Sequence, residues 1–368
     1  MKALQYKRIL LLAVAPAAYG LSCLASAFPY ITEWVYSTSV YPVISGLFGG
    51  LSALVPFSLA ELLLCSVVMF ILTYVFIQLR LLIKKRSGRK KRLLKLFLNS
   101  VIFFGLWYGL FVLICGFNYH RLSFAYYSGL HIRDSSAGEL AALCGELVES
   151  AGELRASVEV DELGIMKSSF ASPYQTAIYA GGAYGFIGEK YPILNGFTPR
   201  PKPVRISRVM SYLNITGIFI PFTFEANVNT DVPDFNIPSS MMHELAHYKG
   251  FMREDEANFI SYLACLESGN TEFEYSGVML ALIHSSNALY SANKEAYYDA
   301  MRPLSEEVWA DLSANSAYWR QFEGPVAEVS TTVNNTYLQV NRQADGVKSY
   351  GRMVDLLLAD YRARHGLE

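Results

Sequence analysis

The segment HELAH, residues 243–247, decides how the second half of this chain folds. Its histidines, His243 and His247, are four residues apart, so on a helix both side chains lie on one face, one turn apart. Two imidazoles placed in this way can bind one metal ion, and Glu244 beside the first can take a proton from water. A proline and two serines just upstream suit a helix start, and Gly250 suits a helix end. The pattern therefore predicts a helix that presents a metal site.

A second helix, predicted over Arg253–Leu266, offers the third ligand that a catalytic zinc site needs besides two histidines. Glu254 and Asn258 are four residues apart and share a face, which gives a carboxylate ligand and a partner that can orient a zinc-bound histidine. Glu256 lies about 200° around the helix from Glu254, so only one of the two can bind the metal. The pairing with Asn258 favours Glu254.

Hydrolysis at such a site also needs a group that stabilises negative charge on a substrate oxygen. Tyr350 and Arg352, in the segment KSYGRM after a turn at Gly346, are the candidates. A tyrosine that packs among C-terminal helices is the alternative interpretation of Tyr350. His284 lies in an apolar stretch and is interpreted as a core histidine.

Three apolar stretches, at about residues 9–28, 57–79 and 96–117, each approach the roughly 20 residues that cross a bilayer as a helix. Hydrophobic residues make up 52% of the chain and charged residues only 17%, below the roughly 25% of soluble domains. Three buried core helices are the alternative interpretation. The first stretch, with its basic start and Ala-Ser-Ala ending, also resembles a secretory signal.

A cluster of nine basic residues without any acid lies between the second and third stretches, at 80–95. Beside two membrane spans it predicts a cytoplasmic loop, and the net charge of −1 argues against nucleic-acid binding. By the positive-inside rule the N-terminus is also cytoplasmic, and the chain after about Asn118 is extracytoplasmic. We therefore expect a multi-pass protein of the cell membrane, with an anchor at 1–117 and an extracytoplasmic domain at 118–368.

That domain is expected to be α+β and mostly α, with a small sheet beside the helix that carries HELAH. The segment GIFIPFTFEANVN, Gly217–Asn229, is rich in β-branched and aromatic residues and predicts a strand. Pro221 indicates an edge strand, which can hold an extended peptide, because proline cannot donate to a ladder. Helices are expected over 135–155, over 174–190 and, with a break at 324–325, over most of the chain from 240 onward.

HELAH with the following Glu-x-x-Ala-Asn, residues 254–258, resembles the gluzincin branch of zinc metallopeptidases. In that branch the first Glu of the second segment is the third ligand, so the resemblance implies Zn²⁺ bound by His243, His247 and Glu254 in a zincin-like domain. The chain departs from the usual pattern, because only six residues separate His247 from Glu254. The turn at Gly250 can permit this short connection.

More closely, nearly the whole chain resembles an uncharacterised bacterial family of membrane proteins with a C-terminal HExxH domain. The resemblance is carried by the three spans and by residues 217–229, 243–259 and 345–358. It implies zinc and a peptidase-like active site, and it implies no substrate.

The leading hypothesis is a membrane-anchored zinc-dependent peptidase with Glu244 as general base and Tyr350 as the charge-stabilising group. Its partners would be membrane lipid and a peptide or protein substrate. The alternative is a membrane sensor or scaffold that keeps a structural zinc site without proteolysis. Intramembrane proteolysis is a weaker third hypothesis, because residues 225–256 are too polar for lipid. The sequence leaves the oligomeric state open.

Overall fold

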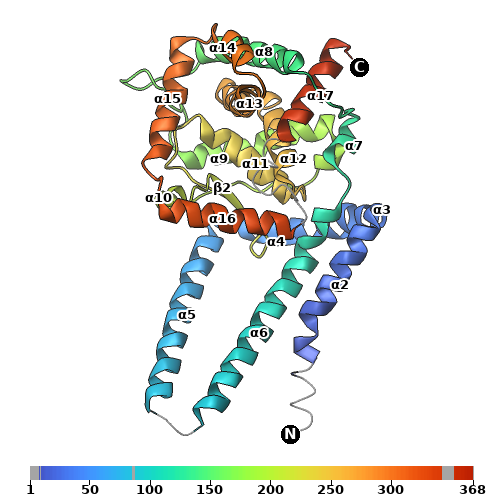
Figure 1. Cartoon of the computed structure of the whole chain (residues 1–368), viewed down its shortest axis with the longest axis vertical. Coiled ribbons are helices and arrows are strands. Elements are labelled where there is room, and N and C mark those ends of the chain that lie inside the picture. Colours follow the sequence, from blue (N-terminus) through green and yellow to red (C-terminus); the bar gives the residue numbers. More distant parts are fainter. Residues whose placement is uncertain (1–7, 9, 85–87, 342–351, 368) are drawn as a thin grey trace.

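Three long helices, α2 (Val14–Ala27), α5 (Leu59–Lys84) and α6 (Arg89–Ile114), project from one side of a larger helical body (Figure 1). All three are long and apolar enough to cross a membrane, the first of them counted from Leu10. The three predicted stretches are thus confirmed as candidate membrane spans. The structure, a computed structural model, describes the following parts of the chain: residue 8 and residues 10–84, 88–341 and 352–367.

The basic segment is more helical than predicted. Helix α5 continues to Lys84 and α6 already begins at Arg89, so most of the expected loop at 80–95 belongs to the two helices. Lysine and arginine are good helix formers, and Gly88, with a left-handed φ of 79°, directly precedes α6. Each helix has 26 residues, about 39 Å, which exceeds the roughly 30 Å hydrocarbon core. The basic ends can therefore lie among lipid headgroups.

Helices α2 and α6 pack closely through small residues. A side chain on Gly109 would overlap Val14, at 2.7 Å, and one on Gly105 would touch Ala15 at 3.4 Å. Glycines four residues apart let two helix backbones approach within a membrane, where packing rather than the hydrophobic effect holds helices together. Helix α5 stands apart from this pair (Figure 1).

The body is mostly helical, and α13 runs through its centre, surrounded by α8, α11, α12, α14 and α17 (Figure 1). Most of the helices predicted after residue 118 are confirmed, and the break at 324–325 separates α15 from α16. Ser136 caps α8 in a capping box with Glu139. The helices of the body are α7 (Phe124–Ser128), α8 (Ala137–Arg155), α9 (Pro173–Lys190), α10 (Ser207–Tyr212), α11 (Asn236–Tyr248), α12 (Glu254–Leu266), α13 (Thr271–Ala292), α14 (Lys294–Met301), α15 (Glu306–Arg320), α16 (Pro325–Val340) and α17 (Met353–His365), with 3₁₀ turns η2 (Gly116–His120) and η3 (Pro192–Leu194).

A small sheet of three strands has the order β1-β3-β2. Strand β1 (Lys202–Pro203) is parallel to β3 (Glu225–Val228), and β2 (Gly217–Ile220) is antiparallel to β3, with Gly217 opposite Val228. The prediction of one strand over 217–229 is therefore wrong, because the chain turns between Ile220 and Glu225 and forms a hairpin. Pro221 ends β2 instead of interrupting it. Strand β2 does lie at the sheet edge, and the expected mostly helical α+β class is confirmed.

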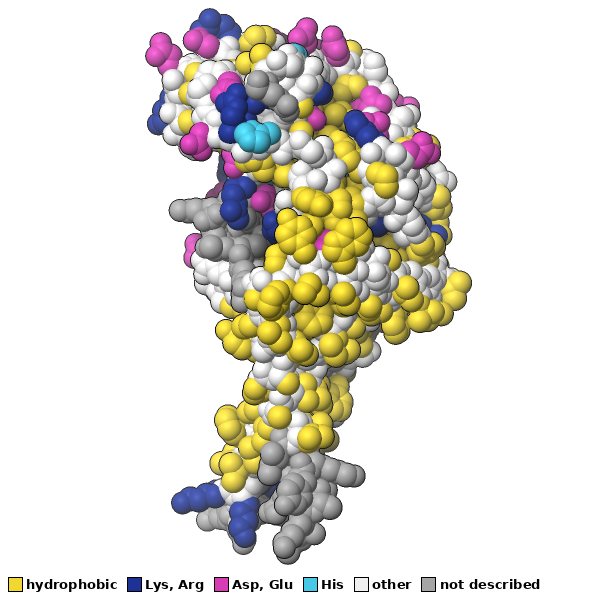
Figure 2. All heavy atoms as spheres, turned by 90° about the vertical axis from the view of Figure 1, so that its right-hand side faces the viewer, with side chains coloured by type: hydrophobic (Ala, Val, Ile, Leu, Met, Phe, Trp, Pro, Cys, Tyr) yellow, Lys and Arg dark blue, Asp and Glu magenta, His cyan; other side chains and the backbone are white. Residues whose placement is uncertain are grey.

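Between α2 and α5 the chain forms a bent helical segment at the base of the body, made of α3 (Pro29–Ile31), the π-helix η1 (Thr32–Val40) and α4 (Tyr41–Ala53). We call residues 29–53 the base segment. Figure 2 shows hydrophobic side chains gathered in a band where the body meets the projecting helices. The base segment contributes Trp34 and Val35 to the exposed apolar surface, at 69% and 60% exposure.

One buried ion pair fixes the base segment to the body. The Glu33 carboxylate accepts hydrogen bonds from the Arg121 guanidinium at 2.7 Å, from the Leu122 N–H at 2.9 Å and from the Tyr127 hydroxyl at 2.6 Å. Both side chains of the pair are almost fully buried, at 1% and 2% exposure. A buried pair whose members make several further hydrogen bonds holds its partners in one geometry.

Substitution Glu33→Gln should therefore destabilise the protein strongly, because it leaves the buried Arg121 charge without its partner. We expect a loss of roughly 3–5 kcal/mol in the free energy of unfolding. Thermal unfolding of the full-length chain in detergent micelles would measure the shift. The control is Glu267→Gln, which removes an exposed ion pair with Lys190 and should cost about 1 kcal/mol or less. Equal shifts for the two variants would contradict this account of the base segment.

Candidate metal centre

The helix α11 carries His243, Glu244 and His247 and ends at a glycine turn. Gly250 has a left-handed φ of 91°. Its N–H donates to the His247 carbonyl at 2.9 Å, and the next N–H, of Phe251, donates back to the Ala246 carbonyl at 3.1 Å. A side chain at Gly250 would also approach Tyr41, Asn118 and Arg121 to about 3 Å, so only glycine fits on both counts. The predicted helix end is confirmed.

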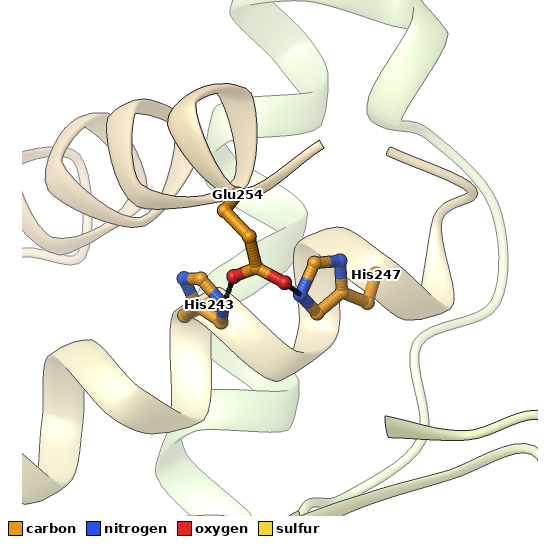
Figure 3. A group of neighbouring side chains, drawn as sticks. All are labelled: His243, His247 and Glu254. Atoms are coloured by element: carbon orange, nitrogen blue, oxygen red, sulfur yellow. Dashed lines mark ion pairs between the residues drawn. The ribbon is translucent and has the colours of Figure 1, made fainter. Parts of the chain in front are cut away.

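This turn brings Glu254, the first residue of α12, to face the two histidines (Figure 3). The Glu254 carboxylate lies between the imidazoles, with one oxygen 3.2 Å from His243 Nε2 and the other 3.7 Å from His247 Nε2. The two rings are perpendicular, with centroids 4.6 Å apart. Ligand atoms of all three residues lie within 4.8 Å of one another. The three predicted ligands therefore form one cluster that could hold a metal ion.

The donor chemistry of the cluster fits a divalent transition metal. His247 Nδ1 contacts the Phe251 carbonyl at 2.7 Å, which orients the ring and leaves Nε2 facing Glu254. A ligating histidine usually has its second nitrogen held in this way. Two imidazoles and one carboxylate are also the ligand set of many catalytic zinc sites. The three side chains are only 10–14% exposed, so a bound ion would be partly shielded from water.

Glu256 lies elsewhere, as expected from its position on the helix. Its carboxylate accepts from the Phe124 N–H at 2.9 Å and pairs with Arg253 at 3.3 Å. The role assigned to Asn258 is not seen. Among the residues that the structure describes, its buried Nδ2 has no hydrogen-bond partner, and the contact that orients His247 comes from the Phe251 carbonyl. A backbone carbonyl leaves no signature in a sequence, so this contact could not be predicted.

The Glu244 carboxylate lies against strand β2. It accepts a hydrogen bond from the Phe219 N–H, and a side chain on Gly217 would overlap its carboxylate. Its Oε2 is buried without a hydrogen-bond partner among the described residues. Burial raises the pKa of Glu244 to about 7, against the opposing effect of the two histidine charges. Its carboxylate thus titrates near neutral pH, as a general base requires.

The remaining candidates have different outcomes. Tyr350 lies outside the described residues. Arg352 precedes α17, and its Nε is 3.8 Å from the carboxylate of Asp255, next to Glu254 in the chain. His284, on α13, is partly buried, and burial together with the charge of His243 lowers its pKa to about 4. This proximity to His243 was not indicated by the apolar stretch around His284.

Charge within the cluster favours proton binding when no cation is present. Burial alone would lower the pKa of His247, but the charge of Glu254 outweighs it and raises that pKa to about 9. Burial alone would raise the pKa of Glu254, but the charges and hydrogen bonds of His247 and His243 outweigh it and hold that pKa far below its usual range. A metal ion would use the imidazole lone pair that carries this proton, so metal and proton compete for His247.

The fold and the site define a mostly helical protein with three candidate membrane spans and a His-His-Glu group that could hold a metal. Within this class, the chain belongs to the family described as protein of unknown function (DUF3810), whose family model matches residues 36–358. No curated protein and no solved structure matches the chain. The predicted relation to an uncharacterised family is confirmed, whereas membership of the gluzincin peptidases stays a prediction.

Metal affinity should rise with pH, because metal binding displaces the proton of His247. Below its pKa of about 9 the imidazole is protonated in the metal-free protein. One proton released per ion corresponds to about a tenfold gain in apparent affinity per pH unit between pH 6 and 8. Competition titrations of the full-length chain against a chelator of known pH dependence would measure how the apparent metal affinity changes with pH. An affinity independent of pH would contradict the coupling between His247 and Glu254.

Proposed function

We propose that this protein is a membrane-anchored, zinc-dependent peptidase. The observation that carries the proposal is the pairing of two features on α11: the cluster of His243, His247 and Glu254, and the buried, partly unpartnered carboxylate of Glu244 next to it. A site that served only to stabilise the fold would gain nothing from a second carboxylate left unsatisfied in this way, since a buried unpartnered polar group costs free energy.

The residues would share the work of peptide hydrolysis as follows. His243, His247 and Glu254 would hold Zn²⁺, which when bound lowers the pKa of water and polarises a carbonyl group. Glu244 would accept a proton from the attacking water and pass it to the leaving amine. The Phe219 N–H holds one end of the Glu244 carboxylate and so fixes the direction of its free oxygen. Tyr350 remains the candidate for stabilising negative charge on the substrate oxygen.

The sheet edge next to the site supports a peptide as the substrate. Strand β2 is hydrogen-bonded to β3 along one side, and its other side faces Glu244 at Phe219. Ile218, between Gly217 and Phe219 on the same strand, is 42% exposed. An extended peptide can be held by main-chain hydrogen bonds along such an edge. A scissile bond held there would lie beside the candidate base.

The proposed active site is extracytoplasmic. Basic side chains gather at the ends of α5 and α6 that point away from the body (Figures 1 and 2). Such residues favour the cytoplasmic side of a membrane. The cluster of His243, His247 and Glu254 belongs to the body at the opposite end of these helices, so the rule places it outside the cytoplasm.

Substitution Glu244→Gln should abolish hydrolysis and leave metal binding intact, because the amide cannot accept the proton and Glu244 is not one of the three residues that could hold the metal. We expect a loss of about 10²–10⁴-fold in rate. Cleavage of a peptide library by the zinc-loaded full-length chain, read by mass spectrometry, would measure it, with Glu267→Gln as the control. Absence of cleavage by the wild type, or equal cleavage by Glu244→Gln, would refute the peptidase and favour a sensor or scaffold.

Substitution Gly217→Ala tests the position of Glu244 without changing its chemistry. The new methyl group would occupy the place of the Glu244 carboxylate, which is flexible enough to move without unfolding the protein. We expect hydrolysis to fall by about tenfold or more, since small displacements of a catalytic group cost that much or more, while zinc content and melting temperature stay close to wild type. The matched control is Gly145→Ala on α8, where an added methyl group meets open space. An unchanged rate in Gly217→Ala would contradict the role of Glu244.

A further inference from the structure

Helix α16 carries a narrow stripe of apolar side chains that the body leaves largely exposed. Each of the five is between 43% and 72% exposed. At 100° per residue around the helix axis, the five side chains project within an arc of about 80°. Scattered apolar residues are normal on a protein surface, but a continuous exposed stripe of this kind indicates an interaction site. The stripe consists of Val326, Val329, Val333, Tyr337 and Val340.

The stripe lies beside the face that docks α16 on the body, and Tyr337 lies at the border between the two. Leu338 is fully buried, and the Ser330 hydroxyl donates to the Leu213 carbonyl at 2.6 Å, which holds the helix in place. A third, polar face includes Thr332 and Gln339, which are exposed. Helix α16 therefore has three distinct faces: one for the body, one apolar and one polar. A helix lying flat at a membrane surface needs the last two.

The position of α16 matches the level at which the candidate span α6 leaves the bilayer. The Tyr337 ring lies 6.5 Å from Phe111, in the last turn of α6, and its hydroxyl is 2.6 Å from that of Tyr119. Aromatic side chains concentrate at this depth in membrane proteins. In Figure 1, α16 runs crosswise at the base of the body, above the ends of α5 and α6.

The hairpin of the sheet confirms that the base of the body lies at this level. Phe222, in the turn between β2 and β3, has its ring centroid 4.0 Å from that of Trp107 on α6. Trp107 is four residues before Phe111, about 6 Å deeper along the helix. A part of the body thus reaches below the level of α16, so the apolar stripe lies within reach of lipid if α6 spans the membrane.

We propose that α16 is an interfacial helix whose apolar stripe lies in the boundary between headgroups and acyl chains of the adjoining leaflet. The partner of this surface is phospholipid, because the stripe ends beside Phe111, where the candidate span α6 meets the body. The binding energy comes from burial of the valine side chains and needs no specific headgroup, since Glu328 is the only charged residue of the helix. The proposal is independent of any peptidase activity.

Photo-crosslinking in lipid nanodiscs tests this placement on the full-length chain. p-Benzoylphenylalanine would replace Val329 or Val333 on the stripe, and Thr332 or Gln339 on the polar face as matched exposed controls. The nanodiscs would contain a phospholipid with an alkyne tag in its acyl chain, so lipid adducts can be counted on the labelled protein. Each variant must elute from a size-exclusion column at the same volume as the wild type, which shows that it is folded. The two stripe positions are tested separately, so the test still stands if one of the two variants fails to fold.

We expect several-fold more lipid adducts at positions 329 and 333 than at 332 and 339. Equal labelling at all four positions, or no lipid labelling at the stripe, would overturn the proposal. Crosslinks from the stripe into a second copy of the chain would also overturn it, since a protein surface would then cover the stripe. None of these readouts depends on bound metal or on hydrolysis, so this test can fail while the proposed peptidase stands.

Discussion

The turn between α11 and α12 is the constraint on which the rest of the site depends. Only six residues lead from His247 to Glu254, and they must reverse the chain and set a carboxylate against two imidazoles. Gly250 makes the reversal possible, and the Phe251 carbonyl in the same turn orients His247. Arg121 stacks on the Phe251 ring at 3.9 Å and donates to the Lys249 carbonyl at 3.1 Å, so the turn is held from outside as well.

The membrane-proximal part of the chain is built into this support. Arg121 is itself fixed by Glu33 of the base segment. The Tyr41 hydroxyl, also from the base segment, donates to the Tyr248 carbonyl at 3.1 Å at the end of α11, and the Tyr248 hydroxyl donates back to Ser45 at 2.8 Å. These contacts cross the boundary expected at residue 117. The base segment, which connects the candidate spans α2 and α5, and the geometry of the candidate site are therefore linked by direct contacts.

The sequence predicted the local features well because each depends on a short stretch of chain. The two histidines follow from their spacing on one helix, the turn from Gly250, and the three candidate spans from length and composition. Glu254 was correctly preferred to Glu256, but through a pairing with Asn258 that the structure does not show. The features that were missed depend on contacts between distant segments or on backbone atoms. These are the hairpin within 217–229, the Phe219 N–H that holds Glu244, the Phe251 carbonyl and the buried Glu33–Arg121 pair. No short pattern marks such contacts.

The central claim is that His243, His247 and Glu254 together bind one metal ion, and elemental analysis of the purified full-length chain tests it most directly. Wild type, His243→Ala and Glu244→Gln would be equilibrated with Zn²⁺ in micelles and freed of excess metal. The account predicts about one zinc per chain in wild type and in Glu244→Gln, and almost none in His243→Ala. Zinc retained by His243→Ala at the wild-type level, or absent from all three proteins, would contradict it.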